Sequence, residues 1–272
     1  MAGQNKKLVV VTINAHRIGR REKILELYEA IKSLEPNVIF IQEIVINMAI
    51  KIFSPNFQVL VNLETPTKDG VGIVTLIDQK MKVIDHKIGD EGRTIGVKTR
   101  EIQFWNVYPK SGTNNKNWRE KYFREELSNH MIVWKDQTRY VIQGGDHNCT
   151  TREIDSENNQ GQHLQKGLVE HFKVHGMLDE YIRLHGNERP VSFSRISRNS
   201  KTRIDLIASN CDKCIEFTYN DIGQGFDHKI GVAEYDIDWI NYLGGSMREI
   251  SLEALGFCQV TKGGYQRKAM VP

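Results

Sequence analysis

Short apolar runs that end in polar residues recur along almost the whole chain and constrain its fold more than any other feature. Leu8–Ile13 leads into Asn14, and Val38–Gln42 leads into Glu43. Later runs end at Tyr108, Asp146, Asn148 and Asp205, and a last run follows Asp227 and His228. Apolar, β-branched runs bounded by turn residues indicate buried strands. Polar groups at strand ends can meet on one rim of a sheet, where a rigid scaffold presents reactive residues.

Helical periodicity separates several of these strands. Apolar residues recur every three or four positions over Arg20–Leu34, and Pro36 ends that helix because the residue before a proline avoids the helical region. Further helices are predicted at Ile46–Phe53, Trp118–Lys135, His163–His175 and Met177–Leu184. Further strands are predicted at Gly70–Ile77, Lys82–Ile88, Thr94–Thr99, Ile102–Val107, Tyr140–Gln143, Arg203–Ser209, Ile215–Tyr219 and Lys229–Tyr235.

The strands between Gly70 and Val107 follow one another through short connections, which predicts antiparallel pairing, since a parallel return needs a longer crossover. The mixture of strands and helices predicts an α/β fold. We expect a four-layer α/β sandwich, in which two packed, mostly antiparallel sheets carry helices on their outer faces.

The chain of 272 residues is long enough for one large domain, and no linker or repeat divides it. We expect one domain over residues 1–240. Residues 241–272 form a C-terminal extension of unknown role, with a candidate helix at Met247–Leu255 and a basic tail after it. The formal net charge of +3 is compatible with a polyanionic partner but does not require one.

The sequence carries no targeting or membrane-spanning signal that we recognise. No apolar run approaches the ~18–20 residues that a spanning helix needs, and the N-terminus lacks the apolar core and cleavage site of a signal peptide. We expect a nuclear or cytoplasmic protein that is not secreted and does not bind membranes. Four cysteines do not make a disulfide framework in a chain of this length, so free thiols are expected.

Glu43 directly follows a buried run, where a carboxylate is costly unless a positive charge compensates it. A Mg²⁺ ion, which takes one or two protein carboxylates and fills its other positions with water and phosphate, would do so. A structural ion pair with a lysine or arginine is the alternative.

Two further motifs can carry acid–base chemistry. Asp146 can take a proton from water and Asn148 can donate to a phosphate oxygen, although an ordinary Gly-Asp turn is the alternative. His228 can donate to a phosphate oxygen that gains charge in a transition state, and Asp205 can hold its imidazole in one tautomer. The alternative is a histidine that lies in a turn without a reactive role.

As an ordered set, these motifs resemble those of the exonuclease–endonuclease–phosphatase superfamily. The resemblance runs from about Leu8 to Asp236 and rests on Asn14, Gln42-Glu43, Asn106-Val107-Tyr108, Gly145-Asp146-His147-Asn148, Arg203-Ile204-Asp205 and Asp227-His228. It implies a metal-dependent phosphodiesterase on a four-layer α/β sandwich. Within the superfamily, the segments Gly70–Ile73, Ile204–Ile207 and Ser192–Lys201 are most similar to the apurinic-like endonuclease domain of non-LTR retrotransposons.

The resemblance also implies a role for each residue. Glu43 is similar to the main metal ligand, Asn14 to the residue that orients water and metal, and Asp227 to a second acid on the metal side. Tyr108 and Asn148 are similar to the phosphate contacts, and Asp146 to the group that activates the attacking water or manages the proton of the leaving group. Asp205 and His228 are similar to the dyad that stabilises charge on phosphorus. Mg²⁺, or Mn²⁺ in its place, would be the cofactor.

The sequence departs from the family pattern at two positions. Phe226 stands where a serine often precedes the final Asp-His pair, and His147 stands where an apolar residue is usual. Neither change removes a primary group.

Four basic residues lie close together between two predicted strands: Arg195, Arg198, Lys201 and Arg203. They suit phosphate contacts, and a solvated charged turn is the alternative. The resemblance implies double-stranded DNA as substrate and a following reverse transcriptase domain as a possible partner. Three other functions remain open: an abasic-site repair endonuclease, a lipid or inositol phosphatase, and a non-catalytic nucleic-acid-binding module.

Overall fold

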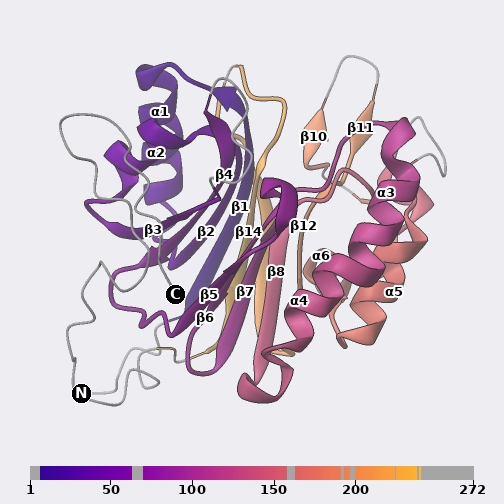
Figure 1. The fold of residues 1–272 in the computed structure, drawn as a ribbon. Coiled ribbons are helices and arrows are strands. Elements are labelled where there is room, and N and C mark those ends of the chain that lie inside the picture. The colour runs from indigo at the N-terminus through magenta and orange to yellow at the C-terminus, as the bar shows by residue number, and fades with distance from the viewer. Residues whose placement is uncertain are drawn as a thin grey trace.

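The computed structural model describes residues 7–62, 70–157, 163–190, 193–196, 200–223, 225–237 and 239. Within these ranges the chain forms two six-stranded sheets packed face to face (Figure 1). The first sheet has the order β13 (Cys214–Asn220), β14 (Ile230–Tyr235), β1 (Leu8–Ile18), β2 (Val38–Val45), β4 (Val71–Asp78) and β3 (Phe57–Val61). The second has the order β5 (Asp85–Ile88), β6 (Thr94–Lys98), β7 (Ile102–Val107), β8 (Tyr140–Asp146), β12 (Asp205–Ser209) and β9 (Leu178–Asp179).

Helices cover the outer face of each sheet (Figure 1). On the first sheet lie α1 (Arg21–Lys32) and α2 (Ile46–Phe53). On the second lie α3 (Lys116–Lys121), a π-helical segment (Tyr122–Leu127), α4 (Ser128–Ile132) and α5 (Lys166–Val174), with α6 (Glu180–His185) against β12 and β13. A small hairpin of β10 (Arg195–Ile196) and β11 (Lys201–Thr202) stands at one end of the sandwich. The four-layer α/β sandwich predicted from the sequence is confirmed.

The pairing within the sheets is mostly antiparallel, as expected. The exceptions are β1 with β2 and β7 with β8, which run parallel. The antiparallel order of β5, β6 and β7 agrees with their short connections. The strand before them does not join that series, because β4 pairs with β2 and β3 in the other sheet.

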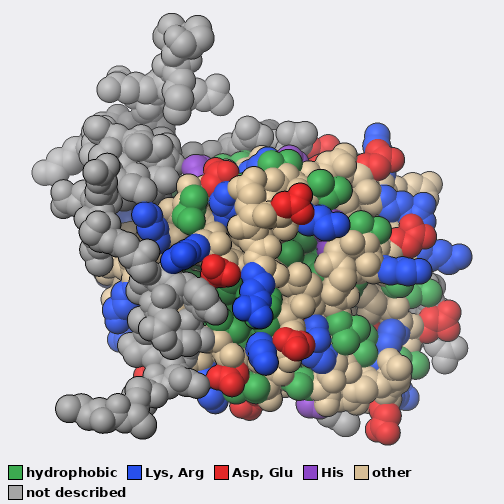
Figure 2. Space-filling view, turned by 90° about the horizontal axis from the view of Figure 1, so that it is seen from below, with side chains coloured by type: hydrophobic (Ala, Val, Ile, Leu, Met, Phe, Trp, Pro, Cys, Tyr) green, Lys and Arg blue, Asp and Glu red, His purple; other side chains and the backbone are tan. Residues whose placement is uncertain are grey.

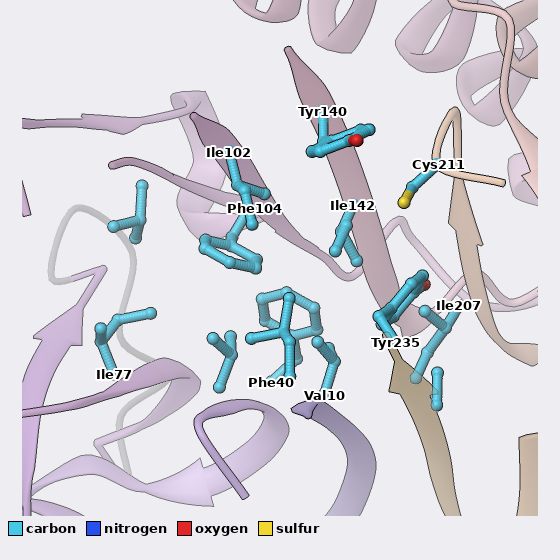
Figure 3. Packing of buried hydrophobic residues seen from close by; sticks show 14 of the residues in the cluster. Val10, Phe40, Ile77, Ile102, Phe104, Tyr140, Ile142, Ile207, Cys211 and Tyr235 are labelled. Atoms are coloured by element: carbon cyan, nitrogen blue, oxygen red, sulfur yellow. The ribbon is translucent and has the colours of Figure 1, made fainter. Parts of the chain in front are cut away.

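The space between the sheets is filled by apolar side chains from both (Figure 3). Val10 and Phe40 point inward from the first sheet and meet Phe104 and Ile142 of the second, and all four are fully buried. There are two further apolar clusters, one between each sheet and the helices that cover it. Ile24, Leu27 and Ile31 of α1, for example, pack on the first sheet as their spacing predicts.

Several element boundaries differ from the sequence predictions. The strand β3 was not predicted, since Phe57–Val61 lacks clear alternation and lies at a sheet edge. The helix expected at Trp118–Lys135 begins at Lys116, passes through the π-helical segment and ends at Ile132. Met177–Leu184 contains the short strand β9 before α6. The predictions for Met247–Leu255 and the basic tail lie outside the described residues.

At the end of the sandwich opposite the β10–β11 hairpin, the described residues carry charges of both signs (Figure 2). On that face, lysine and arginine side chains are interspersed with aspartate and glutamate (Figure 2). Among the described helices, none has the length and apolar character that crossing a membrane requires.

Candidate active site

The predicted polar residues meet at one rim of the sandwich because strands of both sheets bring them there. Asn14 in β1 pairs with Gln42 in β2, and Asp205 at the start of β12 lies opposite Asp146 at the end of β8. The two sheets are joined across this rim by Asn14, whose amide Nδ2 donates to Asp146 Oδ2 at 2.8 Å. Residues 132 positions apart in sequence are thus in direct contact.

Glu43 occupies an irregular position that turns its side chain toward the rim. The pairing of β2 with both neighbours shifts in register at this point, and Glu43 has a φ of 52°. Left-handed backbone at a non-glycine residue is uncommon and is often found at functional sites. A regular strand would place successive side chains on opposite faces, so the bulge changes where Glu43 points.

Two polar side chains hold the carboxylates together. The Asn14 amide that donates to Asp146 also donates to Glu43 Oε1 at 3.3 Å. The Tyr108 hydroxyl donates to the same Glu43 oxygen. The Asn14 carbonyl is itself fixed, because it accepts from the His16 backbone N–H at 2.8 Å.

The glycine before Asp146 is required for this arrangement. Gly145 has a φ of 148°, and a Cβ built on it would lie 1.9 Å from the Val107 carbonyl oxygen. Because backbone atoms of β7 occupy that space, no larger residue fits without displacing the strand. The close approach of β7 and β8 places Tyr108 next to Asp146.

Asp146 is a buried acid poised near neutrality. Burial, and next the neighbouring Asp205 carboxylate, raise the pKa of Asp146 to about 7, while His228 and hydrogen bonds from Asn14 and Asn148 oppose the shift. One of these bonds comes from the Asn148 backbone N–H to Oδ1 at 2.8 Å. A carboxyl with such a pKa can exchange a proton at neutral pH.

Asp205 and His228 form the predicted pair. The His228 Nδ1 lies 2.8 Å from Asp205 Oδ2, and both residues are buried. Burial lowers the pKa of His228, but the Asp205 carboxylate, helped by Asp146 and Asp227, outweighs it and raises the pKa to about 9. The imidazole is therefore protonated at neutral pH, with Nδ1 donating to Asp205.

Asp205 is positioned by neighbours that the sequence prediction did not include. Its backbone N–H donates to Ser194 Oγ at 3.0 Å, and its backbone carbonyl accepts from the Tyr219 hydroxyl at 2.7 Å. The second carboxylate oxygen, Oδ1, is buried and has no hydrogen-bond partner among the described residues. A buried carboxylate oxygen without a partner is costly and favours a positive ligand nearby.

Asp227 lies at the edge of the site rather than within the buried cluster. Its Oδ1 is 3.3 Å from His16 Nδ1 and 3.9 Å from His228 Nε2, and its Oδ2 is 3.3 Å from Arg195 Nε. The free nitrogen of His228 thus faces the open side of the site, where Asp227 is also found.

Tyr108 and Asn148 lie beside the acids. Burial, followed by Asp146 and Glu43, raises the pKa of Tyr108 well above its usual value, so the phenol keeps its proton and can donate. The Asn148 side chain donates through Nδ2 to the Pro109 carbonyl at 2.9 Å. Asn148 has a φ of 51°, and both features fix its position next to Tyr108 and Asp146.

The acids can hold a divalent cation. Single ligand atoms of Asp146, Asp205 and His228 lie within 4.8 Å of one another, and Glu43 is connected to this cluster through Asn14. The predicted metal residues Glu43, Asn14 and Asp227 surround the cluster rather than form it. Several carboxylates and a partnerless oxygen are the oxygen-rich setting that Mg²⁺ favours, so the residues present fit such an ion.

The four predicted basic residues have different environments. Arg195 pairs with Asp227, and Lys201 Nζ lies 3.2 Å from Glu157 Oε1, both at the surface. Arg198 lies outside the described residues. Arg203 corrects the prediction, because it is fully buried and pairs with Asp155 and Asp179. The Arg203 guanidinium pairs with both carboxylates inside the protein. It therefore does not reach the surface, where it could contact nucleic acid.

Two exposed basic residues at the site were missed. His16 pairs with Asp227, and Arg17 Nε lies 3.4 Å from Glu43 Oε2. The prediction ended the strand at Ile13, whereas β1 continues to Ile18. The signal available in the sequence was the pair His16-Arg17, which lies two residues after Asn14.

His147 and the cysteines serve the interior. Burial lowers the pKa of His147 to about 4, so it is neutral, and its ring bonds the Gly145 carbonyl and Gln143. Cys149, Cys211 and Cys214 are buried free thiols, which confirms the expectation for the described cysteines.

Similar folds occur among solved structures. An AP endonuclease from Archaeoglobus fulgidus matches with a TM-score of 0.66 and 19% identity, over 85% of this chain and 100% of that one. The 3′ phosphatase NExo from Neisseria, bound to a product DNA hairpin, matches with 0.66 and 14% over 85% and 100%. TDP2 from Caenorhabditis elegans matches with 0.62 and 15% over 85% and 75%.

No protein-family model and no curated protein sequence matches the chain. The structural similarity is to members of the superfamily whose motifs the sequence resembles. At identities this low it establishes the fold, which these proteins share with the present chain.

Proposed function

We propose that this protein is a Mg²⁺-dependent endonuclease that nicks a DNA phosphodiester bond, and that it serves as the target-site endonuclease domain of a non-LTR retrotransposon. The observation that carries the catalytic part is the buried cluster of Asp146, Asp205 and His228, joined to Glu43 through Asn14. A carboxyl with a pKa near 7 can act as a base beside a protonated imidazole that donates, and hydrolysis of a phosphate ester can use both roles.

Each residue has a defined task in this proposal. Glu43 would hold the ion, with Asn14 orienting it and Asp227 contributing from the edge. The ion, when bound, supplies positive charge against the charge that develops on the phosphoryl oxygens. Mn²⁺ could replace Mg²⁺ in this role, because both accept oxygen ligands.

The protein groups would perform the proton transfers and hold the phosphate. Asp146 accepts a proton from the attacking water as the new phosphorus–oxygen bond forms, and this proton passes to the leaving oxygen as its bond to phosphorus breaks. His228 donates through Nε2 to a phosphoryl oxygen, and Asp205 keeps it protonated. Tyr108 donates through its hydroxyl, and Asn148, fixed by Pro109, presents its amide edge to the phosphate.

DNA is the favoured substrate for two reasons. One similar fold was solved with a product DNA hairpin, and the β10–β11 hairpin, which contains Arg195 and Lys201, adjoins the acids through a backbone bridge from Arg195 to His228. The isolated bridge between Arg195 and His228 connects this hairpin directly to the site. Proteins commonly bind DNA through such phosphate contacts and read its sequence with separate elements.

An abasic-site repair endonuclease is the second candidate, favoured by the similarity to the archaeal AP endonuclease fold. A non-catalytic nucleic-acid-binding module is less consistent with a complete buried acid–imidazole cluster, because strongly shifted pKa values of this kind concentrate at functional sites. The retrotransposon assignment rests on the sequence segments alone. It carries with it a nuclear or cytoplasmic location and a reverse transcriptase domain as possible partner.

One experiment separates these functions. The protein is incubated with supercoiled plasmid, with a duplex carrying one abasic site, and with an inositol phosphate, each in Mg²⁺ or EDTA. Mg²⁺-dependent nicking of intact plasmid supports the proposal. Cleavage confined to the abasic duplex supports repair, phosphate release from inositol phosphate supports a phosphatase, and DNA binding without any cleavage supports a binding module.

A matched pair of variants tests the dyad within this assay. Asp205→Ala and His228→Ala should reduce nicking by similar factors, and the double variant little further, because residues that act as a unit are not additive. Fully multiplicative losses would contradict a shared role.

A further inference from the structure

A bulge in β1 places two basic side chains, those of His16 and Arg17, over the acidic site. Asn14 pairs with Gln42 and Ile18 with Ile44, so three residues of β1 face Glu43 alone. Within the bulge, His16 and Arg17 have φ values of 49° and 58°. Two consecutive residues in the left-handed region are strained, and such strain recurs where function requires it.

The Arg17 side chain is held only weakly. Its side chain is 69% exposed and that of Glu43 is 18% exposed, and their closest atoms lie 3.4 Å apart. Exposed ion pairs of this kind contribute little to stability and exchange readily. Arg17 can therefore leave Glu43 for a stronger anionic ligand, particularly when a cation neutralises Glu43.

A pocket of about 310 Å³ opens beside Arg17, with Glu43 and Tyr108 in its wall. This volume lies at the lower end of the range for small-molecule sites. Since Glu43 and Tyr108 also belong to the acidic site, the pocket is continuous with the place where the phosphodiester is cleaved.

The charge of the pocket favours an anion. Three cations line it against two carboxylates: Arg17, Arg93 and Lys110 against Glu43 and Glu91. Lys110 is paired with Glu91 at 2.6 Å. The Arg93 guanidinium lies over the Tyr108 ring at 5.2 Å and pairs with no carboxylate in the described part of the chain. Once Glu43 binds a cation, the net charge beside the site is positive.

We propose that this pocket is a second phosphate subsite, in which Arg17 holds the phosphate next to the one that is cleaved. The proposal rests on the proposed nuclease function, because a neighbouring phosphate is a property of a nucleic-acid strand. The planar guanidinium of arginine matches a phosphate through two parallel hydrogen bonds. The source is either an internal backbone phosphate or a terminal phosphate at a strand end.

The test removes the negative charge of the phosphate in one set of measurements and the positive charge of Arg17 in another. Duplex oligonucleotides centred on a mapped nick site carry one uncharged methylphosphonate on either side of the cleaved bond. A second pair of duplexes ends at that site with or without a terminal phosphate. Binding is measured by fluorescence anisotropy in EDTA and in Ca²⁺, for wild type and Arg17→Gly. Glycine adopts the left-handed backbone of this position without strain.

Arg100→Ala is the matched control, since Arg100 is an exposed arginine in the turn at the other end of β6. In wild type, one methylphosphonate should weaken binding about tenfold, the scale of a charged hydrogen bond. Arg17→Gly should weaken binding of the unmodified duplex similarly and lose the sensitivity to that methylphosphonate. Arg100→Ala should keep it.

Equal methylphosphonate sensitivity in wild type and Arg17→Gly would overturn the subsite, as would a wild type that responds neither to a methylphosphonate on either side nor to the terminal phosphate. A response only to the terminal phosphate, lost in Arg17→Gly, supports the subsite with strand ends as its ligand. The terminal-phosphate arm needs neither cleavage nor a mapped site. An inactive protein that shows this response would contradict the nuclease function while supporting the subsite.

Discussion

Replacing Asp205 by asparagine should destabilise the protein in a manner that depends on pH. His228 keeps its charge in a buried position because Asp205 accepts from its Nδ1. The side chain of asparagine fits the same space but carries no charge. Without the Asp205 carboxylate, which is the main influence that raises the pKa of His228, burial lowers that pKa.

The size of the effect follows from the shift. The pKa of His228 is raised from 6.5 to about 9, and each unit corresponds to about 1.4 kcal/mol, so the charged pair contributes about 3 kcal/mol. Because the folded-state pKa lies above the unfolded value, this stabilisation is fully present below pH 6.5 and is lost as the pH rises through 9.

The assay is urea unfolding of wild type and Asp205→Asn in EDTA, at several values between about pH 6 and pH 10. The difference in free energy of unfolding should be about 3 kcal/mol at the lowest pH and should shrink steadily above neutrality. Asp221→Asn is the control, because it breaks an exposed pair with Lys229 and should change stability by less than about 1 kcal/mol at every pH. An Asp205→Asn difference that is constant or grows with pH would refute the reasoning.

Three further predictions concern the same site. Burial holds the pKa of folded Asp146 at about 7, above its unfolded value of 3.8. Ionisation of Asp146 in the folded protein is therefore unfavourable, and the protein loses stability as the pH rises from 3.8 to 7. Asp146→Asn should therefore raise the free energy of unfolding at pH 8 in EDTA by about 1–3 kcal/mol, measured in urea, while plasmid nicking disappears. Glu43→Ala should lower the rate of nicking at least about 10²-fold and abolish the rise in Tm that Mg²⁺ produces in wild type. Nicking by the wild type that persists in EDTA would contradict the metal assignment. Arg198→Ala, or a Gly/Ser turn in place of residues 196–201, should change the map of nicked positions more than the rate of nicking. Either change should also reduce the salt dependence of DNA binding by about one unit of slope per lost phosphate contact. Superimposable maps at matched extents of cleavage would show that the hairpin does not select the target.

Much of the fold follows from local patterns in the sequence. The bounds of Ile46–Phe53 and Ile102–Val107 agree with the structure, because dense apolar runs between turn residues specify their own secondary structure. The two-sheet sandwich followed from the number and spacing of such runs. The edge strand β3 did not, since only its pairing with β4 defines it.

The residues of the site were identifiable, but not their partners. Asp205 and His228 are 23 positions apart and Asn14 and Asp146 are 132 apart, so no local pattern could state that they touch. Arg203 illustrates the converse error. A basic residue beside other basic residues suggests a surface, and only the fold shows that Asp155 and Asp179 enclose it.

The sequence by itself determined which chemical groups lie at the ends of which strands, because side-chain type and apolar periodicity are local properties of the chain. The tertiary structure decided how those groups act on one another. Strand register sets Asp146 opposite Asp205, and two bulges turn Glu43 and Arg17 toward the same rim. Burial then raises the pKa of Asp146 to about 7, and the neighbouring Asp205 carboxylate, against the effect of burial, raises that of His228 to about 9. These effects depend on distance and desolvation between segments far apart in sequence, which exist only once the two sheets have packed.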